Sequence, residues 1–496
     1  MNTTNTAVQL KLKVTPQRPA LLAGFDNTVD ILIEIEGPEV PADKLARTPL
    51  NLALVLDRSG SMSGRPLDEA VRCARFIVES LNESDRAALI VYDDDVKVLV
   101  ANKELKNKSH FLKALETINV GGNTDLHSGW LKGAQETASY VSPNCFSRVL
   151  LLSDGQANRG LIKSDAITQQ CSQLAETGVS TSTYGLGYQF NEDLMVRMAR
   201  AGGGNSYYGE TADDLMEPFQ RELDLLSALY AKQVRLRLQA RPGVEMLVLN
   251  PYLHKDAVYV LPDIAYSGVA WAIVRLKAPA ALSGIGDGSV TSLADVIVNA
   301  NDMNGQALEL SSTNIALASL VPQAWNSISE DESVRRRAGE LEAAAIQDQA
   351  RRAARHNDWS TVRRLLDEAR LKAPGNPWVS AVLDTLENLA RQEDQIRFSK
   401  EALYSSHSMS IRLSSRDESA DFNQLVEQNS LSYLRRKTGQ GKADVITDDP
   451  RENDKHPGKT VNANNSTAQQ EPTKNPTPNR IAQFFKWIKT AAGRDN

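Results

Sequence analysis

An apolar run that ends in a short polar loop constrains the fold of this chain more than any other feature. Residues 52–56 read Leu-Ala-Leu-Val-Leu, and the next residues place Asp57, Ser59 and Ser61 in a DxSxS pattern. A long amphipathic helical pattern begins just after Pro66. This order predicts a buried parallel strand, a loop and a helix, with the loop at the carboxyl edge of a sheet, where α/β proteins bind ligands.

Two later loops repeat the arrangement. In residues 120–126 two glycines precede Thr124, and a new helical pattern follows it. A second apolar run, residues 149–152, leads through a serine to Asp154. Carboxylates and hydroxyls are hard oxygen donors, which suit Mg²⁺ with its ligands at about 2.1 Å. If the strands are neighbours, the loops bring together one donor set. Its members are Asp57, Ser59, Ser61, Thr124 and Asp154.

The three loops, in this order along the chain, resemble the von Willebrand factor type A domain with its metal ion-dependent adhesion site. All five ligand positions of that site are present in this sequence. The resemblance covers about residues 48–230. It implies that the hydroxyls of Ser59, Ser61 and Thr124 bind Mg²⁺ or Mn²⁺ directly, and that Asp57 or Asp154, or both, reach the ion through water. It also implies an open coordination position that takes the carboxylate of an Asp or Glu from a protein partner. Arg58 departs from the small residues often found there, and we expect it to tune partner choice without touching the ion.

Alternating strand patterns lie on both sides of this region. Residues 8–14 and 29–35 alternate apolar and polar positions, and the same period returns from Gln233 to about Val298. Two antiparallel strands cannot bury a core alone. We therefore expect one β-sandwich into which the type A domain is inserted. This layout resembles the inter-α-trypsin inhibitor heavy chains and their bacterial intracellular relatives.

The fold class expected is thus α/β, a doubly wound and mostly parallel sheet inserted in a β-sandwich, followed by a helical region and a disordered tail. In the helical region a single helical hairpin packed on the sandwich is favoured over the edge of a tetratricopeptide array. The expected parts are the first sandwich strands in 1–46, the type A domain in 47–231, the sandwich in 232–325, helices in 326–436, a disordered linker in 437–478 and an amphipathic helix in 479–493.

Composition narrows the class of protein. A formal net charge of −6 argues against a nucleic-acid binder, which needs a basic surface. The odd set of three cysteines (Cys73, Cys145 and Cys171) is typical of small core residues in a reducing compartment. The first residues lack the pattern of a secretion signal, and no apolar run is long enough to span a membrane. We expect a cytoplasmic protein.

The remaining motifs leave more than one function or local structure open. The six histidines lie outside any metal or triad motif, so the chain is expected to be a binding scaffold and not an enzyme. A metal-dependent hydrolase and an adaptor of an ATPase or kinase system remain the alternatives. Residues 93–95, three aspartates, fit a solvated turn better than a second metal site. Glycines 202–204 fit a turn better than a phosphate cradle, and the helix starting at Thr211 is expected to reach about Tyr230.

The last stretch has an amphipathic pattern. Phe484, Phe485 and Ile488 share one helical face, with Trp487 alongside and cations around them. So short a helix needs a surface to dock on. We rank a partner groove or an anionic membrane ahead of docking on the chain itself, because a long linker precedes the helix.

Overall fold

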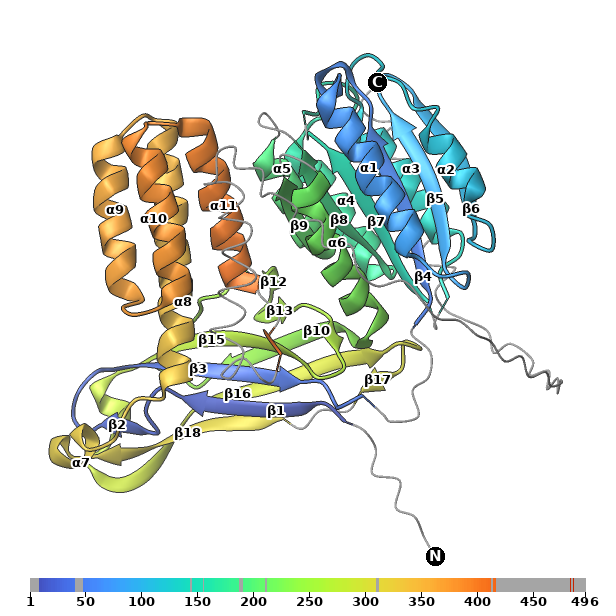
Figure 1. Ribbon diagram of the computed structural model, residues 1–496. Coiled ribbons are helices and arrows are strands. Elements are labelled where there is room, and N and C mark those ends of the chain that lie inside the picture. Colours follow the sequence, from blue (N-terminus) through green and yellow to red (C-terminus); the bar gives the residue numbers. More distant parts are fainter. Residues whose placement is uncertain are drawn as a thin grey trace, which may run out of the picture.

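The computed structural model describes residues 9–40, 48–142, 145–154, 156–186, 191–209, 212–308, 312–411, 414–415, 482 and 485. It contains an α/β domain, a β-sandwich and a helical unit (Figure 1). The α/β domain and the helical unit stand side by side on the sandwich. The expected linker 437–478 lies outside the described residues.

The α/β domain is built on one six-stranded sheet with the order β6-β5-β4-β7-β8-β9, in which only β6 runs antiparallel to its neighbour. Its strands are β4 (Leu50–Asp57), β5 (Arg86–Tyr92), β6 (Val96–Glu104), β7 (Phe146–Ser153), β8 (Val179–Leu186) and β9 (Gly203–Gly209). Its helices are the 3-10 turn η1 (Gly60–Met62), α1 (Arg65–Ser80), α2 (Ser109–Leu115), α3 (Leu126–Ala138), α4 (Ser164–Glu176), α5 (Glu192–Ala201) and α6 (Ala212–Ser227).

Helices cover both faces of this sheet, because alternate residues of β4 enter two different cores. Leu52, Leu54 and Leu56 pack with α1, α2 and α6 on one face. Ala53 and Val55 pack with α3, α4 and α5 on the other. Every residue of β4 is buried, as expected for a central parallel strand. The doubly wound fold expected from the sequence is confirmed.

Two expectations near the end of this domain are wrong in part. Of the glycines 202–204 only Gly202 lies in a turn, because β9 begins at Gly203. A Cβ atom on Gly204 would lie 2.2 Å from the Thr181 carbonyl oxygen, so a glycine lets β9 approach β8. The last helix does not reach Tyr230, since α6 ends at Ser227 and the chain enters β10 at Leu229.

The sandwich consists of two sheets, ordered β1-β3-β15-β11 and β12-β13-β10-β16-β18-β2, with β14, β17 and β19 pairing at their sides. Its elements are β1 (Lys11–Pro16), β2 (Ala20–Leu22), β3 (Asn27–Glu36), β10 (Leu229–Ala240), β11 (Glu245–Val248), β12 (His254–Lys255), β13 (Val258–Val260), β14 (Ile264–Ala265), β15 (Gly268–Ala278), η2 (Ala280–Leu282), β16 (Asp287–Asp302), β17 (Ala307–Leu308), β18 (Thr313–Leu320) and β19 (Ser414–Ser415). All ten residues of β3 pair with β15, and β2 runs parallel to β18. The first strands therefore complete the sandwich, and the α/β domain is inserted between β3 and β10.

The helical unit is larger than the expected hairpin. Its helices are α7 (Pro322–Asn326), α8 (Glu332–Arg355), α9 (Trp359–Lys372), α10 (Pro377–Arg391) and α11 (Gln395–Ile411). Asn376 caps α10 through its side chain, with Pro377 in the first turn, so a third long helix follows α8 and α9. The lower part of α8 packs Val334 and Leu341 against the sandwich near Trp271.

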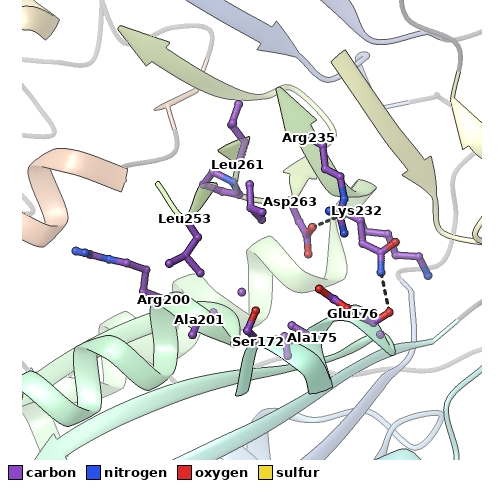
Figure 2. Close-up of a pocket in the computed structure, with 18 of the residues that line it drawn as sticks. Ser172, Ala175, Glu176, Arg200, Ala201, Lys232, Arg235, Leu253, Leu261 and Asp263 are labelled. Atoms are coloured by element: carbon purple, nitrogen blue, oxygen red, sulfur yellow. Dashed lines mark hydrogen bonds between the residues drawn. The ribbon is translucent and has the colours of Figure 1, made fainter. Parts of the chain in front are cut away.

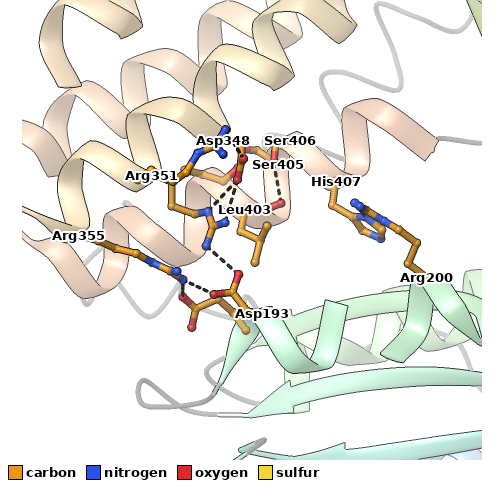
Figure 3. A network of polar contacts seen from close by, with 12 residues as sticks. Asp193, Arg200, Asp348, Arg351, Arg355, Leu403, Ser405, Ser406 and His407 are labelled. Carbon is orange, nitrogen blue, oxygen red and sulfur yellow. Dashed lines mark hydrogen bonds and ion pairs between the residues drawn. The ribbon is translucent and has the colours of Figure 1, made fainter. Parts of the chain in front are cut away.

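Ion pairs join the helical unit to the α/β domain (Figure 3). The carboxylate of Asp193, in the first turn of α5, lies 2.8 Å from Nη1 of Arg351 on α8. Arg355 contacts both Asp193 and Glu192, the latter at 3.1 Å. Nearer the other end of α5, Nη2 of Arg200 lies 3.3 Å from Nδ1 of His407 on α11. The helical unit is thus fixed to the sandwich by apolar packing and to α5 mainly by charge.

Only Ala482 and Phe485 of the expected helix 479–493 belong to the described residues, and both are helical. Phe485 is half-buried and packs against the core that α3, α4 and α5 share with the sheet. This contact supports docking on the chain itself, the alternative that the sequence ranked last. In the part of the chain that the structure describes, every helix is too short or too polar to cross a membrane.

Candidate metal centre

The centre of the candidate site is Asp57, at the carboxyl end of the central strand β4. Strands β5 and β7 flank β4 in parallel, and their register sets Asp57 beside Tyr92 and Leu56 beside Leu152. The ends of β4 and β7 therefore meet at one edge of the sheet, and Asp154 follows β7 there.

Three donors fix the buried carboxylate of Asp57. The Ser59 backbone N–H donates to Oδ1 at 2.9 Å. The Ser153 hydroxyl donates to Oδ2 at 2.6 Å, and the Tyr92 hydroxyl donates to the same oxygen at 3.1 Å. Sequence reasoning missed Tyr92 and Ser153. The available signal was their position, each being the last residue of a strand adjacent to β4.

The electrostatics of Asp57 are those of a carboxylate that lacks a counter-charge. Burial, and next the negative charge of Asp154, raise the pKa of Asp57 to about 6, against the hydrogen bonds from Ser153 and Ser59 that lower it. The repulsion also indicates that the two carboxylates are close together. The positive charge of a divalent cation between them would offset both causes of the shift.

The two serines of the loop are placed as neighbouring donors. Ser59 is buried, Ser61 is an exposed residue of η1, and their hydroxyls are hydrogen-bonded to each other with the Oγ atoms 3.1 Å apart. Two adjacent oxygens of an octahedron with bonds of about 2.1 Å are about 3.0 Å apart, so this spacing fits two ligands of one small cation. The Gly60 N–H donates to the Gly122 carbonyl at 2.7 Å, which ties this loop to the loop of Thr124.

Thr124 is buried directly before α3. Its N–H donates to Oδ1 of Asn158 at 2.8 Å, and its carbonyl accepts the N–H groups of Asn158 and Arg159 at 3.2 Å. The backbone of Thr124 is therefore fixed to the loop that follows β7. Its hydroxyl has no hydrogen-bond partner among the described residues, so it is free to bind an ion. Sequence reasoning missed Asn158, which carries no motif signal.

Asp154 completes the set and is also buried. Its Oδ1 accepts the Gln156 N–H at 3.1 Å, and its carbonyl accepts the Asn191 N–H at 2.8 Å. Asn191 is the N-cap of α5, so the loop of Asp154 is bonded to the start of that helix. The structure thus brings the three loops of all five expected residues to one edge of the sheet.

The donor chemistry fits a hard divalent cation. The described residues contain no cluster of three or more His, Cys, Asp or Glu side chains that would hold a metal. A site here would rest on two carboxylates and three hydroxyls, which are oxygen donors suited to Mg²⁺ or Mn²⁺.

The turn of residues 93–95 forms part of the rim of the site and is not simply solvated. Asp93 is buried, and its Oδ2 lies 2.8 Å from Nη2 of Arg58. Asp94 pairs with Arg159 and accepts the Asn123 N–H at 3.0 Å. Only Asp95 is exposed. Arg58 therefore points to the neighbouring turn, where it pairs with Asp93. Ion pairs with Arg58 and Arg159 account for the aspartates at positions 93 and 94.

Comparison with known proteins agrees with this geometry. Residues 51–221 match the family model of the von Willebrand factor type A domain. "Uncharacterized protein sll0103" of Synechocystis sp. is 28% identical over 205 residues, which are 41% of this chain and 48% of that protein. Human inter-alpha-trypsin inhibitor heavy chain H2 is 23% identical over 170 residues, 33% of this chain and 18% of that one. The chain thus spans less than half the length of either relative.

A likeness in fold extends further along the chain. The structure of a von Willebrand factor type A protein from Catenulispora acidiphila has a TM-score of 0.61 at 16% identity, and the match covers 83% of this chain and 98% of that one. The shared fold therefore includes much of the chain outside the α/β domain. Together these findings identify residues 51–221 as a von Willebrand factor type A domain, similar in sequence to a domain of sll0103 and of inter-alpha-trypsin inhibitor heavy chain H2.

Proposed function

We propose that this protein is a metal-dependent protein-binding scaffold. Type A domains commonly mediate protein–protein interaction, and we assign this role to the three-loop edge. The observation that carries the proposal is the pair Ser59 and Ser61, whose hydroxyls are spaced as ligands of one ion beside the uncompensated carboxylate of Asp57.

The residues of the chain have separate roles in this proposal. Ser59, Ser61 and Thr124 would hold Mg²⁺ or Mn²⁺ through neutral hydroxyls, with Asp57 and Asp154 close by or bridged by water. When bound, such an ion would keep much of its positive charge and offer an open position to an Asp or Glu carboxylate of a partner protein.

Supporting residues fix the donors and shape the rim. Tyr92 and Ser153 hold the Asp57 carboxylate in one orientation. Arg58 is neutralised by Asp93, so it would contribute shape and polarity at the rim and would not compete for the partner's carboxylate. Binding is favoured over hydrolysis because no described histidine is hydrogen-bonded to a donor residue of the site; His127, for example, contacts Gln170.

Calorimetric titration of the full chain with Mg²⁺ and Mn²⁺ tests the metal part of the proposal. We expect saturable binding that is lost in Asp57→Ala and in Asp154→Ala. Asp95→Ala is the matched control, because Asp95 is an exposed rim carboxylate outside the donor set, and it should bind as the parent chain does. Equal affinity in the parent chain and in both loss variants would refute the assignment.

A further inference from the structure

A cleft of about 790 Å³ lies between the α/β domain and the sandwich (Figure 2). Its lining includes residues at the starts of β7 and β8, whereas the candidate metal site is at the ends of β4 and β7. Its lower wall comes from α4, the end of α5 and the start of β9. Its upper wall comes from β10 and the segment from Tyr252 to Asp263. Small-molecule sites commonly have volumes of about 300–1,000 Å³, so this cleft is large enough for one.

The cleft collects arginines that lack a carboxylate partner. Arg200 lies on one wall, and Arg235 and Arg237 lie two residues apart on β10 in the other. None of these three forms an ion pair, whereas most arginines in the described part of the chain do. Arg241, just after the same strand and outside the cleft, pairs with Asp295 at 2.8 Å.

Arg200 forms no ion pair, although the charge of Asp348 on α8 acts on it. Its Nη2 faces Nδ1 of His407, and its Nε has no hydrogen-bond partner. Burial, together with the charge of Arg200, lowers the pKa of His407 to about 3, so this neighbour is a neutral imidazole and not an anion. Lys232, on the opposite wall, donates from Nζ to the Met303 carbonyl at 2.9 Å and also forms no ion pair.

One acid of the cleft, Asp263, interacts with the charge of Lys232, whereas no described acid forms an ion pair with Arg200, Arg235 or Arg237. Asp263 accepts the Gln233 backbone N–H at 2.8 Å. Glu176 and Asp256 are exposed, and neither forms an ion pair. A concave site with separated cations on both walls attracts anions, and guanidinium groups bind phosphoryl oxygens in a paired, planar geometry.

The remaining lining is apolar or lacks side chains. Leu253 and Leu261 come from the upper wall and Ala175 and Ala201 from the lower one (Figure 2). The glycines 202–204 line the same wall and leave it open. A ligand with an anionic group and an uncharged body matches this combination of charge and apolar surface.

We infer that this cleft is a binding site for a phosphorylated small molecule, separate from the metal centre and independent of a divalent ion. Arg235 and Arg237 contact the phosphoryl group from β10, and Arg200 adds charge from the opposite wall. The apolar side chains hold the body of the ligand. The protein then carries two sites of different chemistry, one near each end of β7.

The test uses the full chain in EDTA, which removes any contribution from the metal centre. The probe is N-methylanthraniloyl-ADP, followed by fluorescence anisotropy, with inorganic pyrophosphate as competitor. We expect saturable binding that pyrophosphate displaces and that added salt weakens.

The decisive variant is Arg235→Gln with Arg237→Gln, two exposed positions where an amide keeps much of the side chain. We expect at least an about tenfold weaker affinity, because charge-assisted hydrogen bonds are lost. Arg241→Gln is the matched control and should bind as the parent chain does. Unchanged affinity in the double variant, or no binding by the parent chain at about 1 mM probe, would overturn the inference. Thermal unfolding of each variant would show that the fold is kept.

Discussion

Replacing Asp57 by asparagine should make the metal-free protein more stable at neutral pH. The carboxyl has a folded-state pKa of about 6 against an ordinary value of 3.8. Between these values the folded state keeps a proton that the unfolded state has lost, so stability falls as the pH rises through this window. Above about pH 6 the whole penalty remains. A shift of about two pKa units corresponds to about 3 kcal/mol.

The neutral amide removes this penalty but is a poorer acceptor. One carboxylate oxygen now takes bonds from both Ser153 and Tyr92, and an amide group can match only part of that pattern. We therefore expect Asp57→Asn to gain about 1 to 3 kcal/mol at pH 7.5 in EDTA. At pH 4 the parent carboxyl is itself protonated in the folded state, so the gain should disappear.

The assay is urea unfolding followed by circular dichroism, in EDTA and in Mg²⁺, at both pH values. Saturating Mg²⁺ should reverse the order at pH 7.5, because the parent chain gains about 4.1 kcal/mol at a thousandfold excess over Kd and the variant gains nothing. Asp95→Asn is the control and should follow the parent chain throughout. A loss of stability in Asp57→Asn in EDTA at pH 7.5, or an equal gain at both pH values, would refute the reasoning.

Three further predictions concern packing and docking. Glu222→Gln should cost about 3 kcal/mol in urea unfolding, because it leaves the buried guanidinium of Arg148 unpaired; an effect below about 1 kcal/mol would contradict a buried pair. Asp193→Asn and Arg351→Gln should each loosen the helical unit, and the double variant should lose less stability than the sum of the two, with a coupling of about 1 to 2 kcal/mol in a double-mutant cycle. Phe485→Ala should lower the unfolding free energy by about 1 kcal/mol if the half-buried ring packs on the α/β core, and no change would leave membrane or partner docking in its place.

The fold and the meeting of the three loops at one edge were predictable because their signals are local. Asp57, Ser59 and Ser61 lie within one loop. Thr124 precedes a helical pattern, and Asp154 follows an apolar strand pattern. Only the parallel pairing of β4 with β5 and β7 was needed to bring them to one edge, and buried apolar runs indicate such pairing.

What the sequence did not reveal depends on tertiary contacts. Tyr92 and Ser153 reach Asp57 only because their strands are neighbours. β9 was missed since three glycines are typical of a turn, whereas here a glycine allows a close strand approach at Thr181. The cleft of Arg200 and Arg235 exists only because two domains meet there, and no local pattern records that meeting.

The most direct test of the central claim is capture of partner proteins from lysate on the immobilised full chain, in Mg²⁺ and in EDTA. Thr124→Ala is run in parallel, because this buried hydroxyl is a donor whose loss leaves the backbone bonds to Asn158 and Arg159 in place. The account predicts proteins that are retained in Mg²⁺, released by EDTA and absent from the Thr124→Ala column. Identical recovery in Mg²⁺, in EDTA and on the variant would contradict it.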